Sequence, residues 1–344
     1  MTQTDRLVRP DVLGPFLAAE LGDERWRELS ATLIAGGKSN LTFLLSSAAG
    51  ELVLRRPPDG PVLPTAHDMA REARVQRALH STPVPVPVIV ALDAGGSVFG
   101  TPFYAMQKVA GQVIRGEIPS SYVDSSAQCE ALADELVAVL AALHAVDPVE
   151  VGLADFGRPE GFLERNVRRW YAQWEASRTA DVPAVEALGR ELLACVPARS
   201  GTGIVHGDFR LDNCMMSLDR PPRVAALLDW EMSTLGDPLT DLGMLLFYWR
   251  EAGEDPNGIT PTVTATAGFP GRAHLTRRYA EFSGRDVTDL AFYEAHAHFK
   301  FAVIAQGIAA RVAAGSMAGQ DFGDLSAHVV GVAERGLARL TKHG

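Results

Sequence analysis

The chain has 344 residues, of which 47% are apolar and 22% are charged, and its formal net charge at pH 7 is -10. This composition is that of a globular protein, and the length suffices for two ordinary domains or for one two-lobed unit. Because the negative charge is spread along the chain, the sequence excludes nucleic acid as the main partner, since binding a phosphate backbone requires a basic surface.

The first third of the chain is predicted to be rich in β-strands. The first thirty residues show helical periodicity, and a helix rich in Ala, Arg and Glu is expected over 67–80. Residues 83–88 alternate proline with valine, and because proline removes a donor and fixes φ, this stretch predicts an extended connector. Strands are expected over 41–45, 51–54 and 103–106, the first two joined by a turn at 49–50.

The remainder of the chain is predicted to be mostly helical. Apolar residues recur along one face of a long helix, at Leu132, Leu136, Val139, Leu140 and Leu143. Further helices are expected over 162–175, 185–195 and 292–314, with a short strand-rich island at 204–205 and 224–228. Strands followed by helices predict an α+β fold, although many α+β folds share this composition.

The element order is that of a bilobal protein-kinase-like fold, with a small β-rich N-lobe and a larger, mostly helical C-lobe. We expect residues 1–107 to form the N-lobe, from an N-terminal helix and an antiparallel sheet. Residues 108–344 are expected to form the helical C-lobe, with the catalytic loop and the substrate site.

The cysteines and the N-terminal residues predict the compartment. Cys129, Cys195 and Cys214 are far apart and show no CxxC pairing, which disfavours a disulfide framework or a zinc site. Residues 1–10 lack the apolar core of a signal peptide, and no apolar run reaches the roughly 20 residues that span a bilayer. The sequence therefore predicts a cytoplasmic protein with no membrane partner.

The strongest chemical signal is the segment His206–Asn213, with the sequence HGDFRLDN. The expected strand before it delivers His-x-Asp, and Asn213 follows Asp208 by five positions. This spacing matches a kinase catalytic loop, in which the Asp accepts the proton of the substrate hydroxyl and the Asn holds magnesium. A carboxylate beside the hydroxyl orients it in line with the γ-phosphate, and an amide oxygen ligates the metal without adding charge.

A second acidic motif follows 21 positions after Asp208, where Asp229 ends an apolar strand in the sequence LLDW. Its carboxylate suits a second magnesium ligand that would neutralise phosphate charge. Further on, either Asp237 or Asp241 is expected to cap an apolar helix, with a structural role favoured for Asp241.

These motifs, together with GDPxxDLG at 236–243, resemble the aminoglycoside-phosphotransferase/choline-kinase superfamily. The chain is most similar to the branch that includes the kinase-like domains fused to some acyl-CoA dehydrogenases. The GGKSN stretch at 36–40 and the stretch LVLRRPP at 52–58 support that branch. The similarity covers roughly 33–246 with matching motifs and extends more weakly to 311.

The resemblance implies roles for several residues of the N-lobe. The phosphate-covering loop would comprise Gly36, Gly37, Lys38, Ser39 and Asn40, although this stretch alone is neither a P-loop nor GxGxxG. Arg55 falls where kinases place the phosphate-contacting lysine, with Arg56 as the alternative, and Glu72 falls at the position of its helix partner. Gln107 and Val109 lie in the implied hinge, whose backbone would bind adenine.

The resemblance implies an ATP- and Mg2+-dependent kinase that transfers the γ-phosphoryl group of ATP directly to a small-molecule hydroxyl. Asp208 would act as the base, Asn213 and Asp229 would hold magnesium, and Arg55 would contact the phosphates. The acceptor is either aminoglycoside-like or another metabolite, with a non-antibiotic metabolite favoured. A hydroxylated acyl or acyl-CoA-like acceptor would use basic residues such as Arg165, Arg168, Arg169 and Arg250.

Two other functions fit parts of the sequence. A protein kinase is disfavoured because the chain shows no DFG and no recognisable APE segment. A catalytically idle nucleotide- or metabolite-binding module is disfavoured because Asp208, Asn213 and Asp229 are all present. The choice between ATP and GTP and the oligomeric state, a homodimer included, stay open.

Overall fold

A computed structural model describes residues 3–34, 40–58, 67–118, 123, 125–219, 221–254, 260–313 and 325–341. The chain divides into two compact units, Met1–Gly111 with Ala225–Ser233, and Gln112–Val224 with Thr234–Gly344. Residues 108–111 and 225–233 therefore group with the first unit. The physical reason is local bonding, because the backbone N–H of Leu227 donates to the Pro85 carbonyl (2.8 Å) and the Arg71 side chain donates to the Ser233 carbonyl (3.1 Å).

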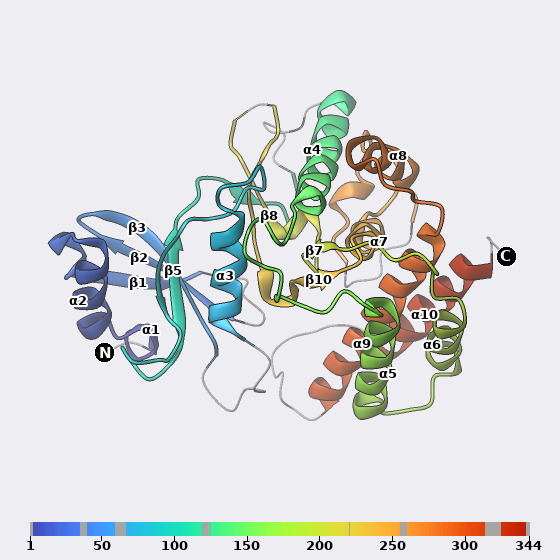
Figure 1. Cartoon of the computed structure of the whole chain (residues 1–344), viewed down its shortest axis with the longest axis horizontal. Coiled ribbons are helices and arrows are strands. Elements are labelled where there is room, and N and C mark those ends of the chain that lie inside the picture. The colour runs from blue at the N-terminus through green and yellow to red at the C-terminus, as the bar shows by residue number, and fades with distance from the viewer. Residues whose placement is uncertain are drawn as a thin grey trace. The chain divides into compact units, whose positions relative to one another are not determined.

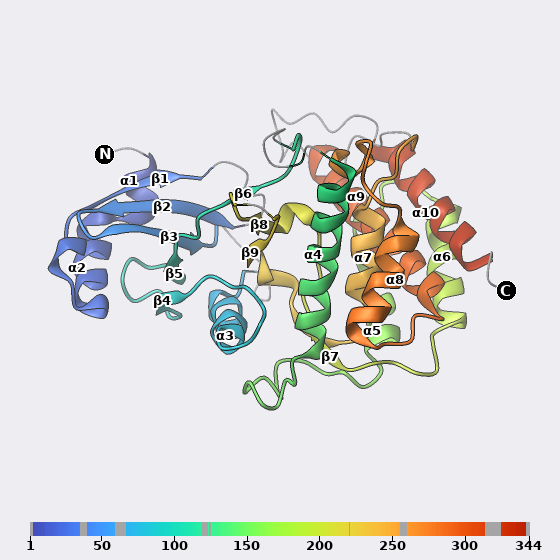
Figure 2. The same cartoon turned by 90° about the horizontal axis from the view of Figure 1, so that it is seen from above.

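The first unit contains a five-stranded antiparallel sheet (Figure 1). Its strands follow the order β1-β2-β3-β5-β4 (Figure 2). Its strands are β1 (Leu29–Leu33), β2 (Leu41–Ser47), β3 (Gly50–Arg56), β4 (Ile89–Asp93) and β5 (Phe103–Gln107). Its helices are α1 (Gln3–Val8), α2 (Pro10–Leu21) and α3 (Met69–Leu79), with a 3-10 turn η1 (Glu24–Trp26). The predicted hairpin over 41–54 is confirmed, since β2 and β3 pair from Leu41↔Arg56 to Ser47↔Gly50.

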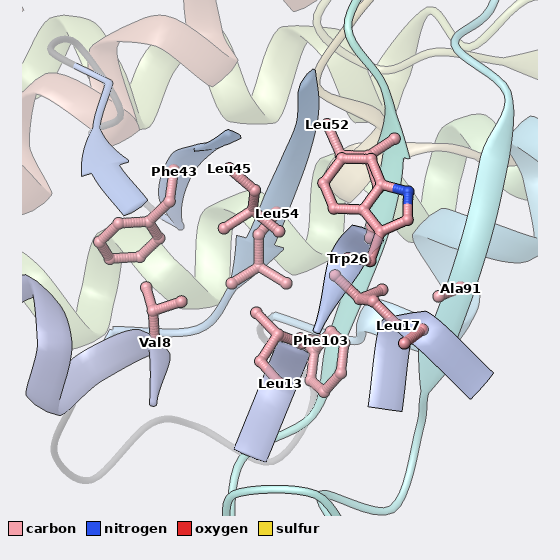
Figure 3. Close-up of a cluster of buried hydrophobic side chains, with 12 residues drawn as sticks. Val8, Leu13, Leu17, Trp26, Phe43, Leu45, Leu52, Leu54, Ala91 and Phe103 are labelled. Carbon is pink, nitrogen blue, oxygen red and sulfur yellow. The ribbon is translucent and has the colours of Figure 1, made fainter. Parts of the chain in front are cut away.

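The two faces of this sheet pack against different helices, because side chains alternate along a strand. Figure 3 shows Leu52 and Leu54 of β3 among the residues that pack with Leu13 and Leu17 of α2. On the other face, Val53 belongs to a cluster that contains residues of α3. Neighbouring residues of β3 therefore point to opposite faces of the sheet.

The second unit is mostly helical (Figure 2). Its helices are α4 (Ser126–Ala145), α5 (Phe162–Ser177), α6 (Pro183–Ala194), α7 (Leu239–Tyr248), α8 (Arg272–Ser283), α9 (Leu290–Ala313) and α10 (Leu325–Thr341). Short strands β6 (Gln112–Val113) and β8 (Cys214–Met216) pair with each other, as do β7 (Gly203–Val205) and β10 (Thr234–Gly236). The buried helix α9 packs against α5, α7 and α10, so it lies at the centre of this unit.

The expected helices over 162–175, 185–195 and 292–314 are confirmed as α5, α6 and α9. Residues 83–88 form neither helix nor strand, as the alternating prolines predicted. Among the helices in the described ranges, none is both long and apolar enough to cross a bilayer.

Candidate active site

In the first unit, one arginine binds three carboxylates. Arg55 of β3 forms an ion pair from Nε to Glu72 Oε2 of α3 at 2.9 Å. Its terminal nitrogen Nη2 lies 2.5 Å from Asp229 Oδ1 and 3.7 Å from Glu231 Oε2. We call these four side chains, with Asn40, the Arg55 cluster. The predicted neighbours Arg55 and Glu72 form an ion pair, and their role towards phosphate stays a prediction.

The Arg55 cluster is extensively hydrogen-bonded, with Asn40 and Glu72 buried and its other members partly buried. Asn40 donates from Nδ2 to Glu72 Oε1 (3.0 Å) and Glu231 Oε2 (3.3 Å), and the Tyr104 hydroxyl donates to Glu72 Oε2 (3.0 Å). Burial raises the pKa of Glu72, and Asp229 adds to this rise, while Arg55 and the Tyr104 hydrogen bond oppose it. Burial disfavours the charge on Arg55, but its acidic neighbours outweigh that penalty and raise its pKa. The cluster therefore holds more carboxylates than cations, which suits an additional cation.

The backbone at Asp229 is in the left-handed region, at φ 66° and ψ 63°. Asp229 follows β9 (Val224–Leu227) and precedes the 3-10 turn η3 (Trp230–Met232). The turn is fixed by Trp230, whose Nε1 donates to the Leu227 carbonyl at 3.0 Å. A non-glycine residue in this conformation is uncommon and costs energy, so the surrounding structure must hold it there. Such held conformations are concentrated at functional sites, which strengthens the candidacy of Asp229.

Arg56, the alternative phosphate contact, lies on the opposite face of β3. Its guanidinium donates to the carbonyls of Leu7 (2.5 Å) and Pro57 (3.0 Å) and lies 5.9 Å from the ring centroid of Phe99. The alternation of the strand therefore brings Arg55, and not Arg56, to the cluster.

Only some of the other residues predicted to bind the nucleotide lie within the described ranges. Gly36, Gly37, Lys38 and Ser39 lie outside the described residues. Asn40 is buried and bonded to the acidic cluster, and its Oδ1 also lies 2.6 Å from His67 Nδ1. At the end of β5, the backbone N–H of Gln107 donates to the Val88 carbonyl at 2.9 Å. That N–H is thus engaged within the unit, and the contact of Gln107 and Val109 with adenine stays a prediction.

In the second unit, a buried carboxylate holds the predicted catalytic loop, residues 206–213. The backbone N–H groups of His206 and Gly207 donate to the two carboxylate oxygens of Asp241, at 2.6 and 2.8 Å. Gly207 has φ 84°, a conformation that glycine adopts without strain. The N–H of Asp208 donates to His206 Nδ1 at 3.2 Å. The backbone before Asp208 is therefore fixed by three successive hydrogen bonds.

The structure brings together Asp208 and Asn213 of the predicted catalytic loop. Asn213 Nδ2 donates to the Asp208 carbonyl (2.8 Å) and to its Oδ2 (3.0 Å), so the amide oxygen takes no part in these two bonds. Arg210 bridges two carboxylates, with Nε 3.2 Å from Asp208 Oδ2 and Nη1 3.1 Å from Asp212 Oδ2. The sequence reasoning missed Arg210, and the only available signal was its position two residues after Asp208.

Behind the loop, Asp241 is supported by a second buried layer. His144 Nε2 lies 3.3 Å from Asp241 Oδ2, and its Nδ1 lies 2.7 Å from the Tyr279 hydroxyl. Burial lowers the pKa of His144, which keeps the ring neutral. Burial alone would raise the pKa of Asp241, but the hydrogen bonds that it accepts lower it. Of the two capping candidates, Asp237 caps α7 through the Leu239 N–H (3.0 Å), and Asp241 supports the catalytic loop.

A pocket adjoins the catalytic loop within the second unit. It is lined by apolar and aromatic side chains and by one acid and one arginine, among them Ile114, Leu245, Tyr248, Trp249, Arg210 and Asp212. The Arg210 guanidinium lies 4.8 Å from the ring centroid of Tyr248. Arg210 therefore lines the pocket and also pairs with the predicted base, Asp208.

Each unit offers oxygen donors that suit a metal ion. Among the described residues, no group of three His, Cys, Asp or Glu side chains forms a metal site. The Asp229 carboxylate and the Asn213 amide oxygen are hard oxygen donors of the kind that magnesium prefers. Glu72 and Glu231 add negative charge beside Asp229, which fits a cation there, and Arg55 now occupies one of its oxygens.

An antiparallel sheet followed by a mostly helical unit is the order of a kinase-like α+β fold, and comparison with solved structures confirms this fold class. The structure of a thermostable mutant of aminoglycoside phosphotransferase APH(4)-Ia, in complex with ADP and hygromycin B, aligns with a TM-score of 0.62 over 95% of this chain and 98% of that chain. At 15% identity this likeness shows the fold alone.

The chain belongs to the phosphotransferase enzyme family, which matches residues 30–273. A candidate aminoglycoside phosphotransferase from Ralstonia eutropha is 35% identical, with a TM-score of 0.78 over 91% of this chain and 93% of that chain. Rat acyl-CoA dehydrogenase family member 11 is 35% identical over 92% of this chain, and mouse member 10 is 34% identical over 87%. The chain spans only 41% and 28% of the lengths of these two relatives. The predicted resemblance is thus confirmed.

Proposed function

We propose that this protein is an ATP- and magnesium-dependent kinase that phosphorylates a hydroxyl group of a small metabolite. The proposal depends most on one observation: the Asp208 carboxylate is hydrogen-bonded to Asn213 and ion-paired with Arg210, in a loop whose backbone Asp241 holds. A carboxylate fixed in this way orients a hydroxyl and accepts its proton as the phosphoryl group is transferred. ADP bound to the structural relative APH(4)-Ia supports the choice of an adenine nucleotide.

Each predicted residue has a defined task in this proposal. Asp208 orients the acceptor hydroxyl and takes its proton, while Arg55 contacts the phosphates. Asn213 and Asp229 would hold magnesium, which supplies neutralisation of phosphate charge when it is bound. Gly36, Gly37, Lys38, Ser39 and Asn40 are proposed to cover the phosphates. Glu72 is proposed to hold Arg55, and Gln107 and Val109 are proposed to lie beside the adenine.

The acceptor is proposed to be a metabolite and not a polycationic antibiotic. The pocket beside the catalytic loop has apolar and aromatic walls with one acid, Asp212, which pairs with Arg210. A polycationic sugar would need several unpaired carboxylates instead. The dehydrogenase-fused relatives favour a hydroxylated acyl or acyl-CoA-like acceptor, as the sequence resemblance implied.

Most of the basic residues suggested for such an acceptor are already engaged. Arg165 donates to the backbone carbonyls of Glu160 and Arg158, Arg168 pairs with Glu164 at 2.7 Å, and Arg250 lies 3.6 Å from Glu254. Arg169 forms no ion pair among the described residues and lies 5.4 Å from the ring centroid of Trp170. Of the four, Arg169 is therefore the best candidate for contacting an acidic acceptor.

The test is ADP release with ATP and magnesium across aminoglycosides, hydroxyacyl-CoAs, amino alcohols and sugars. For the acceptor that gives turnover, Asp208→Asn is expected to lower kcat by about 10²–10⁴-fold, while ATP still raises the melting temperature. Asp219→Asn, at an exposed aspartate of the same unit, is the matched control and should behave as wild type. Full turnover in Asp208→Asn, or a wild-type protein that neither binds ATP nor releases ADP, would contradict the proposal. Nucleotide binding without turnover for any acceptor would favour the idle module.

A further inference from the structure

Lysine is rare in this chain, and one of its lysines is buried beside the catalytic loop. Lysine occurs only at positions 38, 108, 300 and 342, whereas lysine and arginine together number 32. Lys300 lies on α9 with 5% of its surface exposed, and its Nζ donates to the backbone carbonyl of Gly207. A compact ammonium with rotatable donors fits a single carbonyl better than a planar guanidinium does, which explains lysine at this position.

Two charged side chains of opposite sign thus bind the backbone N–H and the backbone carbonyl of Gly207. The N–H of Gly207 donates to Asp241 of α7 at 2.8 Å, and its carbonyl accepts from Lys300 of α9. This carbonyl belongs to the peptide group that joins Gly207 to Asp208. Fixing it restricts the rotation of the backbone from which the Asp208 side chain projects.

A buried ammonium is unfavourable unless nearby groups compensate for the lost hydration. Burial lowers the pKa of Lys300, Asp208 and Asp241 oppose this effect, and Arg169 and Arg210 add to it. The Trp170 ring offers a further favourable contact, with its centroid 5.6 Å from Nζ. A methionine would fill the same space without the desolvation cost, so stability alone does not explain a lysine here.

We infer that Lys300 is a positioning residue for phosphoryl transfer, which holds the Gly207 carbonyl so that Asp208 keeps one orientation towards the acceptor hydroxyl. The inference rests on the proposed function, because it gives Lys300 a purpose only if Asp208 acts on an acceptor. It goes further by assigning part of the catalytic geometry to a helix 93 positions along the chain from Gly207.

The first experiment compares Lys300→Met with Gln306→Met in turnover and thermal stability. Gln306 is a matched control because it is also a buried polar residue of α9, but it bonds to Ser177 and Thr179 rather than to the loop. Lys300→Met is expected to lower kcat about 100-fold, since small misplacements have effects of this size, with the KM for ATP unchanged and the melting temperature equal or higher. Gln306→Met should instead lower the melting temperature and leave kcat unchanged.

The second experiment does not depend on turnover. Hydrogen–deuterium exchange of the His206 and Gly207 amides is expected to become at least tenfold faster in Lys300→Met, with exchange in β2 and β3 unchanged. Unchanged exchange at these amides, or unchanged kcat despite faster exchange, would overturn the inference. A wild-type protein without turnover would count against the proposed function, and exchange would then still decide whether Lys300 holds the loop.

Discussion

The two candidate regions fix their carboxylates in different ways. In the Arg55 cluster the interactions are ion pairs between side chains, because the Arg55 guanidinium lies among the carboxylates of Glu72, Asp229 and Glu231. In the catalytic loop, the supporting carboxylate of Asp241 binds backbone N–H groups. The first arrangement depends on charges that a bound cation or nucleotide would change, whereas the second is fixed by the chain itself.

This difference indicates which region adapts to a ligand. A cation bound by Asp229 would compete with Arg55, which now lies 2.5 Å from one of its oxygens. The loop carries Asp208 on backbone that three hydrogen bonds already define, so it needs no such exchange. We therefore expect substitutions in the Arg55 cluster to alter nucleotide binding most, and substitutions behind the loop to alter stability and turnover.

The largest expected effect is that of Asp241→Asn. The asparagine would direct an NH2 group at one of the backbone donors of His206 and Gly207, and it would remove the charge of a fully buried carboxylate. Breaking such a buried network costs about 3–5 kcal/mol of the free energy of unfolding. Urea unfolding measures this loss, with Asp289→Asn, at an exposed position, as the control. A loss below about 1 kcal/mol would show that the carboxylate does not hold the loop.

Arg55→Met should have the next largest effect, and Arg56→Met is its natural partner. Loss of Arg55 leaves Glu72 buried without its cation, which we expect to lower the free energy of unfolding by about 3 kcal/mol. It should also abolish the rise in melting temperature that ATP causes. Arg56 binds backbone carbonyls on the other face of β3, so Arg56→Met should destabilise the protein but retain that rise. Equal nucleotide responses in the two variants would contradict the assignment of Arg55.

Long periodic segments made much of the fold predictable. The helices α5, α6 and α9 were located because their apolar residues recur over many turns. Strand β1 was not predicted, because none of its five residues is fully buried and only two are partly buried, so it carries little apolar signal. Residues 225–233 join the first unit through bonds to distant backbone such as Pro85, and no local sequence pattern indicates such bonds.

The candidate site was predictable where spacing along the chain determines it. Asp208 and Asn213 lie five positions apart on one loop, so their contact follows from local geometry. Glu231 and Lys300 were not assigned their contacts, because these depend on the left-handed turn at Asp229 and on the packing of α9. Sequence patterns report which face a residue occupies, but not which atom a long side chain reaches.

The smallest expected effect is a difference between the two units in how their stability changes as pH falls. The second unit buries His296 and His298, and burial lowers their pKa values to about 3 and about 4. Below the unfolded pKa of about 6.5, the unfolded chain binds protons that the folded unit excludes, so stability falls as pH falls towards those values. Each histidine should contribute about 1.2 kcal/mol to this loss between pH 6 and pH 5, because the unfolded imidazole is already mostly protonated at pH 6. In the first unit the raised pKa of Glu72 acts in the opposite direction, because there the folded state retains the proton.

The variant His298→Gln keeps a donor for the Glu294 carbonyl and should reduce the loss of stability between pH 6 and pH 5 by that amount. The variant His80→Gln, at an exposed position, should not. Urea unfolding at pH 6 and pH 5, with hydrogen exchange to locate the loss, would count against this comparison if the first unit opened before the second.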